Sequence, residues 1–183
     1  MTLRKYAHAF DRSTIGRHVS GTAKSGRRGH IPAPLRAWIH SPELGARAQR
    51  LGEFVRYNTE LGADLSELAI LVVARDWGAI FEWDAHKREA LKAGIEPHVI
   101  EAIRTRAIPA FPSDKARIVY CYTKTLLETR FIPSPLHDEA VTALGQAGLA
   151  ELVGVVGYYT FVAMTLNAFE IGVEEGSGDL GVS

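Results

Sequence analysis

Residues Glu67 to His86, with the sequence ELAILVVARDWGAIFEWDAH, decide the fold of this chain. The run from Leu68 to Val73 is apolar at every position and lacks the alternation of a half-buried strand, so it predicts a buried helix. The helical pattern continues to Gly94, which exceeds the roughly 8–20 residues of a usual globular helix. We therefore expect a central buried helix that is interrupted at Gly78.

Further helical segments lie on both sides of this stretch. Ser41-Pro42-Glu43 is a typical helix start, and the apolar residues after it recur at three- and four-residue steps. Asp64 or Ser66 is expected to cap the central helix. The remaining helices are expected at residues 41–61, 96–106, 113–130, 136–144 and 149–171. Because no segment shows the alternation of a strand, the sequence predicts an all-α fold of about six helices.

The chain is expected to form one domain with a polar segment at each end. Of its 183 residues, 46% are hydrophobic and 23% are charged, which is usual for a globular domain. Residues 1–30 hold seven Lys or Arg against one acidic residue and are rich in Ser and Gly, which predicts a basic flexible arm or subunit-wrapping tail. The predicted domain spans residues 31–173, and residues 174–183 are expected to form a polar tail.

Charge and hydropathy indicate which partners to expect. The 21 basic and 21 acidic residues balance, which argues against nucleic acid and acidic membrane as partners. The apolar stretch from Leu152 to Phe169 approaches transmembrane length, but glycines and polar residues interrupt it, so a helix buried within a homo-oligomer is favoured over a membrane span. Cys121 is the single cysteine, which excludes an intramolecular disulfide and favours a cytoplasmic location. Its apolar surroundings predict that it is buried.

Three titratable residues are candidates for acid/base chemistry. Glu82 and His86 lie four residues apart on one predicted helix, so the carboxylate is expected to hydrogen-bond the imidazole and to raise its basicity. Such a pair is more often a solvated surface pair. Glu67 is the third candidate, although its simplest role is to complement the helix dipole. In one straight helix Glu67 and Glu82 are about 22 Å apart, so they meet only if the helix breaks or across a subunit boundary.

Five other residues are candidates for binding a substrate. Arg75 has the planar guanidinium that suits a carboxylate, although a surface ion pair is the more frequent use. Trp77 and Trp83 can wall a pocket or simply pack in the core. Tyr159 and Asn167 lie in an otherwise apolar helix, where their polar groups need partners and where bracing neighbouring helices is the alternative role. The His-x-x-x-His and Cys-x-x-Cys spacings of a zinc site do not occur, so no metal is expected.

Several of these segments together resemble the carboxymuconolactone decarboxylase family. The similar segments are Glu67 to Leu71, Trp77, Phe81 to His86, Ala90 to Gly94, Gly157-Tyr158-Tyr159, Leu166 to Phe169 and Ser41 to Leu44. The resemblance covers residues 31–173, and the Glu-Trp-x-x-His element is its most specific part. It implies an alkylhydroperoxidase-like (AhpD-like) helical fold and a homo-oligomer, a trimer or a hexamer.

The chain departs from the alkylhydroperoxidase-like relatives of that family at the thiols. In those proteins a Glu is followed by a Cys-x-x-Cys pair and then a His. Glu67 and His86 match the flanking positions, but Ala79 and Glu82 stand where the two cysteines are expected. Peroxide reduction through a dithiol needs two adjacent cysteines, and Cys121 alone does not supply them. The sequence therefore argues against that redox chemistry.

The resemblance implies a cofactor-free decarboxylation, or a related proton shift, on a small carboxylated lactone from the breakdown of aromatic compounds. In this hypothesis His86 protonates the dienolate formed by loss of CO₂, Glu82 orients His86, and Glu67 completes the proton relay. The alternative from another class is a non-catalytic helical oligomer that binds a small ligand or partner. A peroxidase-type oxidoreductase is a third hypothesis.

Overall fold

The structure, a computed structural model, describes residues 33–171 and Leu180, and it is all-helical over these residues. The helices are α2 (Leu35–Trp38), α3 (Pro42–Tyr57), α4 (Ala63–Asp76), α5 (Ile80–Lys92), α6 (Pro97–Arg104), α7 (Asp114–Thr129) and α8 (Ser134–Ala168). These residues contain no strand, as predicted. The expected basic arm and the polar tail, apart from Leu180, lie outside the described residues.

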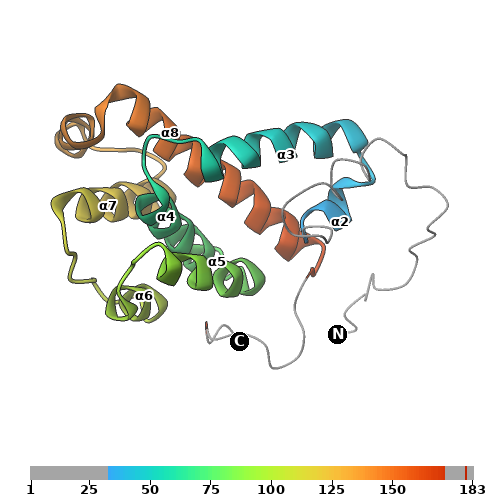
Figure 1. Cartoon of the computed structure of the whole chain (residues 1–183), viewed down its shortest axis with the longest axis horizontal. Coiled ribbons are helices and arrows are strands. Elements are labelled where there is room, and N and C mark those ends of the chain that lie inside the picture. The colour runs from blue at the N-terminus through green and yellow to red at the C-terminus, as the bar shows by residue number, and fades with distance from the viewer. Residues whose placement is uncertain (1–32, 172–179, 181–183) are drawn as a thin grey trace.

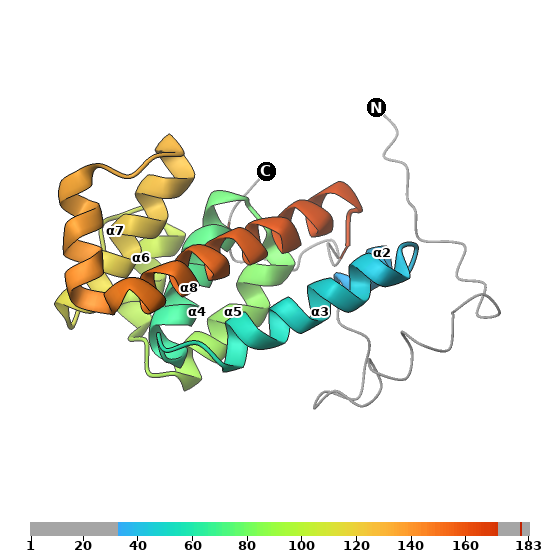
Figure 2. The same cartoon turned by 90° about the horizontal axis from the view of Figure 1, so that it is seen from above.

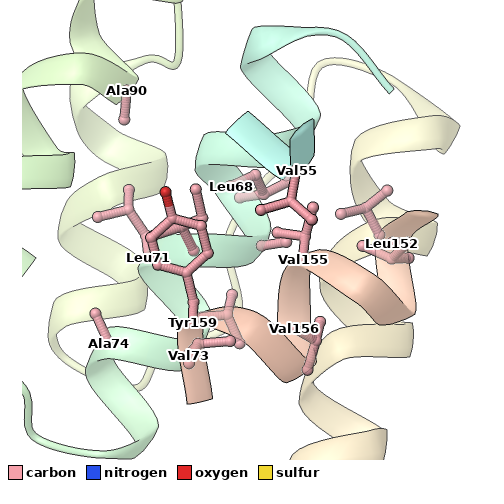
Figure 3. Close-up of a cluster of buried hydrophobic side chains, with 14 of the residues drawn as sticks. Val55, Leu68, Leu71, Val73, Ala74, Ala90, Leu152, Val155, Val156 and Tyr159 are labelled. Atoms are coloured by element: carbon pink, nitrogen blue, oxygen red, sulfur yellow. The ribbon is translucent and has the colours of Figure 1, made fainter. Parts of the chain in front are cut away.

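Helix α4 is the centre of the molecule. It contacts α3, α5, α6, α7 and α8, and every residue from Leu65 to Ala74 is buried. Figures 1 and 2 show the other helices arranged around it, with α3 and α8 side by side along one face. Figure 3 shows that side chains of α3, α4 and α8 form the core, with Leu71 and Val155 among them. The continuous apolar run of the sequence is therefore explained by contacts on all sides of α4.

The predicted break at Gly78 and the gap predicted between residues 144 and 149 both coincide with a glycine in left-handed backbone, although at Gly145 the helix is kinked rather than divided in two. Helix α4 ends at Asp76, Gly78 has φ +58°, and α5 begins at Ile80. In α8 the backbone kinks at Gly145, where φ is +73° and ψ is 169°. Such angles are strained for residues with a Cβ atom, so glycine is the residue expected there. The bend at Gly78 matters most because it folds α5 back against α4.

The ends of some helices differ from the prediction. Neither Asp64 nor Ser66 caps α4, because the helix begins at Ala63, directly after Gly62 at φ +82°. Ser113 does cap α7, accepting a hydrogen bond from the backbone N–H of Ala116 at 3.2 Å.

Cys121, which the sequence predicted to be buried, is half-buried.

The four-residue helix α2 was not predicted because long-range contacts hold it. The indole Nε1 of Trp38 donates a hydrogen bond to Thr165 Oγ1 at 3.1 Å, and its ring stacks on Phe161 with centroids 4.9 Å apart. Both partners belong to α8, more than 120 residues further along the chain. No local sequence pattern signals contacts of this range.

Helix α8 is the one helix among the described residues that is long and apolar enough to span a membrane. Half of its most apolar window is buried inside the molecule, and core helices of globular proteins can be equally long and apolar. It runs antiparallel to α3, because Gly52 lies opposite Tyr158 while the backbone N–H of Glu60 donates to Glu151 Oε2 at 2.6 Å. At Gly52 the approach is closest: a Cβ atom there would lie 2.2 Å from the Tyr158 hydroxyl oxygen.

Replacing Gly52 with alanine is expected to destabilise the protein by about 1–3 kcal/mol, because the new methyl group overlaps the Tyr158 ring and pushes it out of the α3–α8 contact. Gly157→Ala is the matched control in α8. A Cβ atom at Gly157 meets nothing within 4 Å, so the higher helix propensity of alanine should stabilise the protein by about 0.5–1 kcal/mol. Urea denaturation of both variants measures the difference, and a Gly52→Ala variant as stable as the wild type contradicts the packing described.

Candidate active site

A buried hydrogen bond joins Glu67 of α4 to His86 of α5. The distance from Glu67 Oε2 to His86 Nδ1 is 2.7 Å, and the two side chains are 9% and 6% exposed. The bend at Gly78 brings the two residues together by laying the first half of α5 along α4. A buried carboxylate in contact with Nδ1 fixes the tautomer of the ring and stabilises its protonated form. The pair therefore has the geometry of an oriented acid/base histidine.

The predicted hydrogen bond between Glu82 and His86 is absent, and this part of the prediction is wrong. Glu82 is buried in the first turn of α5, at 2% exposure, and neither of its carboxyl oxygens has a hydrogen-bond partner among the described residues. The one-turn spacing allowed the bond, but His86 turns toward α4 and bonds Glu67 instead. Glu67, not Glu82, orients the imidazole.

The surroundings of Glu82 favour its neutral form. Burial raises the pKa of the Glu82 carboxyl well above its usual range, because the charged form has lost its hydration. A protonated carboxyl is a hydrogen-bond donor, whereas a carboxylate only accepts. Glu82 and the Glu67–His86 pair therefore offer different chemistry within one buried region.

Two tyrosines of α8 extend this region toward α3. The ring of Tyr159 meets the His86 ring edge to face, with centroids 4.9 Å apart, and Tyr158 meets Tyr159 in the same way at 5.3 Å. Figure 3 shows Tyr159 in the cluster of buried side chains to which Leu71 and Val73 of α4 also belong. Burial raises the pKa of Tyr158 to about 12 and raises that of Tyr159 further, so both hydroxyls keep their protons near neutral pH.

Three other predicted binding residues are held by neighbouring helices or buried in the core. Arg75 donates from Nε to the backbone carbonyl of Arg104 at 2.6 Å, near the end of α6. Trp83 is fully buried in the core. Asn167 is exposed and donates to the backbone carbonyl of Trp77 at 2.9 Å, so it braces the end of α4 against α8. The bracing alternative describes the observed contacts of Arg75 and Asn167.

The sequence did not single out Tyr158, Gly52 or Arg56. Arg56 lies one turn after Gly52 on α3, and its positive charge opposes the rise in the pKa of both Tyr158 and Tyr159 that burial causes. The signal that was available is a glycine in the middle of an amphipathic helix, which indicates a close approach by a neighbouring element. Its partner in α8 had no comparable signal.

A separate surface hollow lies on the α7 side of the molecule. It has a volume of about 410 Å³ and is lined by Pro109, Phe111, Pro112, Ser113, Asp114 and Arg117. None of the candidate site residues lines it. Within residues 33–171 no three His, Cys, Asp or Glu side chains gather in a way that would hold a metal ion.

Comparison with known families gives one match in the middle of the chain. The model of the carboxymuconolactone decarboxylase family matches residues 42–119, which include Glu67, Glu82 and His86. Tyr158 and Tyr159 lie beyond the matched part. The chain matches none of the curated proteins with which it was compared.

Solved structures share the fold at low sequence identity. A protein of unknown function from Agrobacterium tumefaciens, proposed to be the antioxidant defence protein AhpD, has a TM-score of 0.66 and 15% identity over 76% of this chain and 96% of its own. An uncharacterized peroxidase-related protein from Silicibacter has a TM-score of 0.76 and 13% sequence identity, and the match covers 97% of both chains. The debrominase Bmp8, solved with 2,3,4-tribromopyrrole, has a TM-score of 0.71 and 12% sequence identity, and the match covers 96% of this chain and 93% of its own. These structures support an AhpD-like fold.

Proposed function

We propose that this chain is a cofactor-free decarboxylase-like enzyme acting on a small carboxylated lactone. The match of the carboxymuconolactone decarboxylase family model over residues 42–119 supports the proposal, and so does the fold that the chain shares with the similar structures. The buried hydrogen bond between Glu67 and His86 is the observation that carries the proposal. It supplies an oriented proton donor in a place from which most water is excluded.

The proposed reaction needs a stabilised anion and then a proton. Loss of CO₂ from the ring carbon leaves an electron pair that moves through the double bond into the lactone carbonyl and forms a dienolate. Protonated His86 gives its proton to the dienolate carbon from Nε2, and Glu67 stabilises the imidazolium until that step. The pair then regains a proton from water.

Glu82 has a different role from the one the sequence suggested. As a neutral carboxyl it can donate a hydrogen bond to the lactone carbonyl oxygen, where negative charge develops in the dienolate. A protonated buried carboxyl stabilises an enolate in the same manner in ketosteroid isomerase. Its lack of a partner among the described residues is consistent with a group that meets the substrate.

The direct test is the absorbance of carboxymuconolactone incubated with the purified protein. Catalysed loss of the absorbance, with one CO₂ released per molecule consumed, is the expected result. If the lactone raises the melting temperature but is not consumed, the protein only binds it, which is the non-catalytic alternative.

Peroxide reduction is the rival activity, because the names of the similar structures include an antioxidant defence protein and a peroxidase-related protein. Ala79 and Glu82 occupy the positions at which the resemblance places the two thiols, and Cys121 lies elsewhere, on α7. We expect no consumption of hydrogen peroxide with a thiol reductant. Peroxide consumption that persists in Cys121→Ser would contradict this expectation.

The homo-oligomer, trimeric or hexameric, and the cytoplasmic location remain proposals drawn from the resemblance. Exposed apolar side chains on α3 and α8, among them Leu51 and Met164, are consistent with association. Light scattering of the purified chain measures the assembly.

A further inference from the structure

The bend between α4 and α5 is held by hydrogen bonds at the end of α4. The backbone N–H of Ala79 donates to the carbonyl of Ala74 at 2.9 Å, and Gly78 between them has φ +58°. This is the pattern in which a left-handed glycine ends a helix. The carbonyl of Trp77, next to the glycine, receives no backbone N–H among the described residues. A helix end leaves such carbonyls without a partner, so a donor from elsewhere in the molecule is needed.

Asn167 supplies that donor. From the last turn of α8, its Nδ2 donates to the Trp77 carbonyl oxygen at 2.9 Å, although the two residues are 90 positions apart in the chain. A backbone carbonyl only accepts hydrogen bonds, so the amide nitrogen is the group that can face it. A carboxylate of the same size has no proton to donate. The chemistry of the amide, rather than its size, therefore completes the hydrogen bonds of the bend.

Helix α8 also contacts α5 at the histidine. The ring of Tyr159 packs edge to face against the His86 ring, with centroids 4.9 Å apart. Tyr159 and Asn167 are eight residues apart, or about 12 Å along the axis of α8. Helix α8 therefore supports α5 at two points, the bend that precedes it and the reacting imidazole.

The direction of α5 decides whether His86 reaches Glu67. Eight residues separate Gly78 from His86, which corresponds to about 12 Å of helix. A rotation of α5 by about 10° around the bend therefore moves the imidazole by about 2 Å. The hydrogen bond from His86 Nδ1 to Glu67 Oε2 is 2.7 Å long and does not survive such a displacement. Small changes at the bend are thus amplified at the pair.

We propose that Asn167 is a positioning residue of the site: by holding the Trp77 carbonyl, it fixes the direction in which α5 leaves the bend and keeps His86 within hydrogen-bond reach of Glu67. Asn167 acts from the surface and does not touch the substrate. The inference rests on the proposed function for its effect on turnover. Its effect on the Glu67–His86 pair is observable without any substrate.

Three variants of the full chain test the inference. Asn167→Asp has the same shape but lacks the donor, and Asn167→Gln keeps an amide donor on a longer side chain. Asn58→Asp is the matched control, because the exposed Asn58 also donates from Nδ2 to a backbone carbonyl, that of Glu53 at 3.3 Å, at the end of α3. Circular dichroism checks that each variant is folded. Asn167→Ala, which also lacks the donor, replaces Asn167→Asp if that variant loses helix.

The first measurement is the ¹⁵N chemical shift of the two His86 ring nitrogens, from long-range ¹H–¹⁵N correlation spectra. The signals are assigned by their loss in His86→Gln. A carboxylate bonded to Nδ1 fixes the position of the ring proton, so the wild-type shifts should differ from those of an imidazole in water. In Asn167→Asp they should move toward the values in water. Asn167→Gln should move less, and Asn58→Asp should give the wild-type spectrum.

The second measurement is turnover of carboxymuconolactone. Asn167→Asp is expected to lower kcat by about 10–100-fold, since a misplacement of about 1 Å can cost about 100-fold. KM should change much less, because Asn167 makes no contact with the substrate. Asn167→Gln should recover most of the rate, and Asn58→Asp should retain the wild-type kcat.

The inference is overturned if folded Asn167→Asp gives the wild-type nitrogen shifts, or if Asn58→Asp changes them equally. Either result would mean that the contact only stabilises the fold. An unchanged kcat in Asn167→Asp, with an active wild type, also rejects it. If the wild type does not consume the lactone, the proposed function is wrong, and the nitrogen shifts alone decide whether Asn167 positions the pair.

Discussion

His86→Gln is expected to lower turnover of carboxymuconolactone by about 10²–10⁴-fold, the usual contribution of a positioned acid or base. Glutamine retains a polar side chain next to Glu67 but cannot carry a proton to the dienolate. His86 is 5% exposed and contacts Tyr159, so a residue of similar length limits the loss of packing. The measurement is kcat by absorbance, with circular dichroism to show that the helix content is unchanged.

The matched control for this prediction is His98→Gln. His98 is an exposed histidine near the start of α6, where it contacts Glu96 and the backbone carbonyl of Ala110. The His98→Gln variant should turn over the lactone at the wild-type rate. Glu67→Gln should lower kcat as well, because the neutral amide no longer stabilises the imidazolium. Retained activity in folded His86→Gln would reject the catalytic role of the pair.

Glu82→Gln is expected to make the protein more stable at neutral pH and to flatten the dependence of stability on pH. The folded protein keeps the Glu82 proton to a higher pH than the unfolded chain, whose carboxyl titrates near the usual Glu pKa of about 4.3. Above that pH the unfolded state therefore binds fewer protons than the native state. The free energy of unfolding of the wild type then falls with rising pH, by up to about 1.4 kcal/mol per pH unit, until the folded-state pKa is reached.

Urea denaturation at a series of pH values from about 4 to 8 measures this effect. Below the usual Glu pKa both proteins should be of similar stability, and the difference should grow as the pH rises. Glu53→Gln, at an exposed position on α3, is the control and should leave the pH dependence unchanged. The prediction is wrong if Glu82→Gln is less stable than the wild type at neutral pH. Its turnover should nevertheless fall, because an amide is a weaker donor to the dienolate oxygen than a carboxyl.

Much of the helical architecture was predictable because it depends on local signals. The apolar run of α4 and the glycine at position 78 define one buried helix and the bend that follows it. Ser113 marked the start of α7 through its side-chain oxygen. Helix α2 was missed because four residues contain too little periodic pattern, and its contacts with α8 lie far along the chain.

The candidate site was predictable in its residues but not in its pairing. Glu67, Glu82 and His86 were identified as candidates. The four-residue spacing between Glu82 and His86 nevertheless led to the wrong prediction that these two side chains are hydrogen-bonded. The observed bond depends on the direction in which α5 leaves the bend, and the sequence does not specify that direction. The contact of Gly52 with Tyr158 was missed for a similar reason: α3 meets α8 about one hundred residues later, and no local pattern fixes the register between them.

The short bend between α4 and α5 also bears on the order in which the molecule folds. Glu67 and His86 are only 19 residues apart, so closing the loop between them costs little chain entropy. Contacts of such short range form early, whereas the pairing of α3 with α8 must wait for a much longer loop to close. The reacting residues should therefore meet within a helical hairpin before the tyrosines arrive, and hydrogen exchange during refolding should protect the amides of α4 and α5 before those of α3.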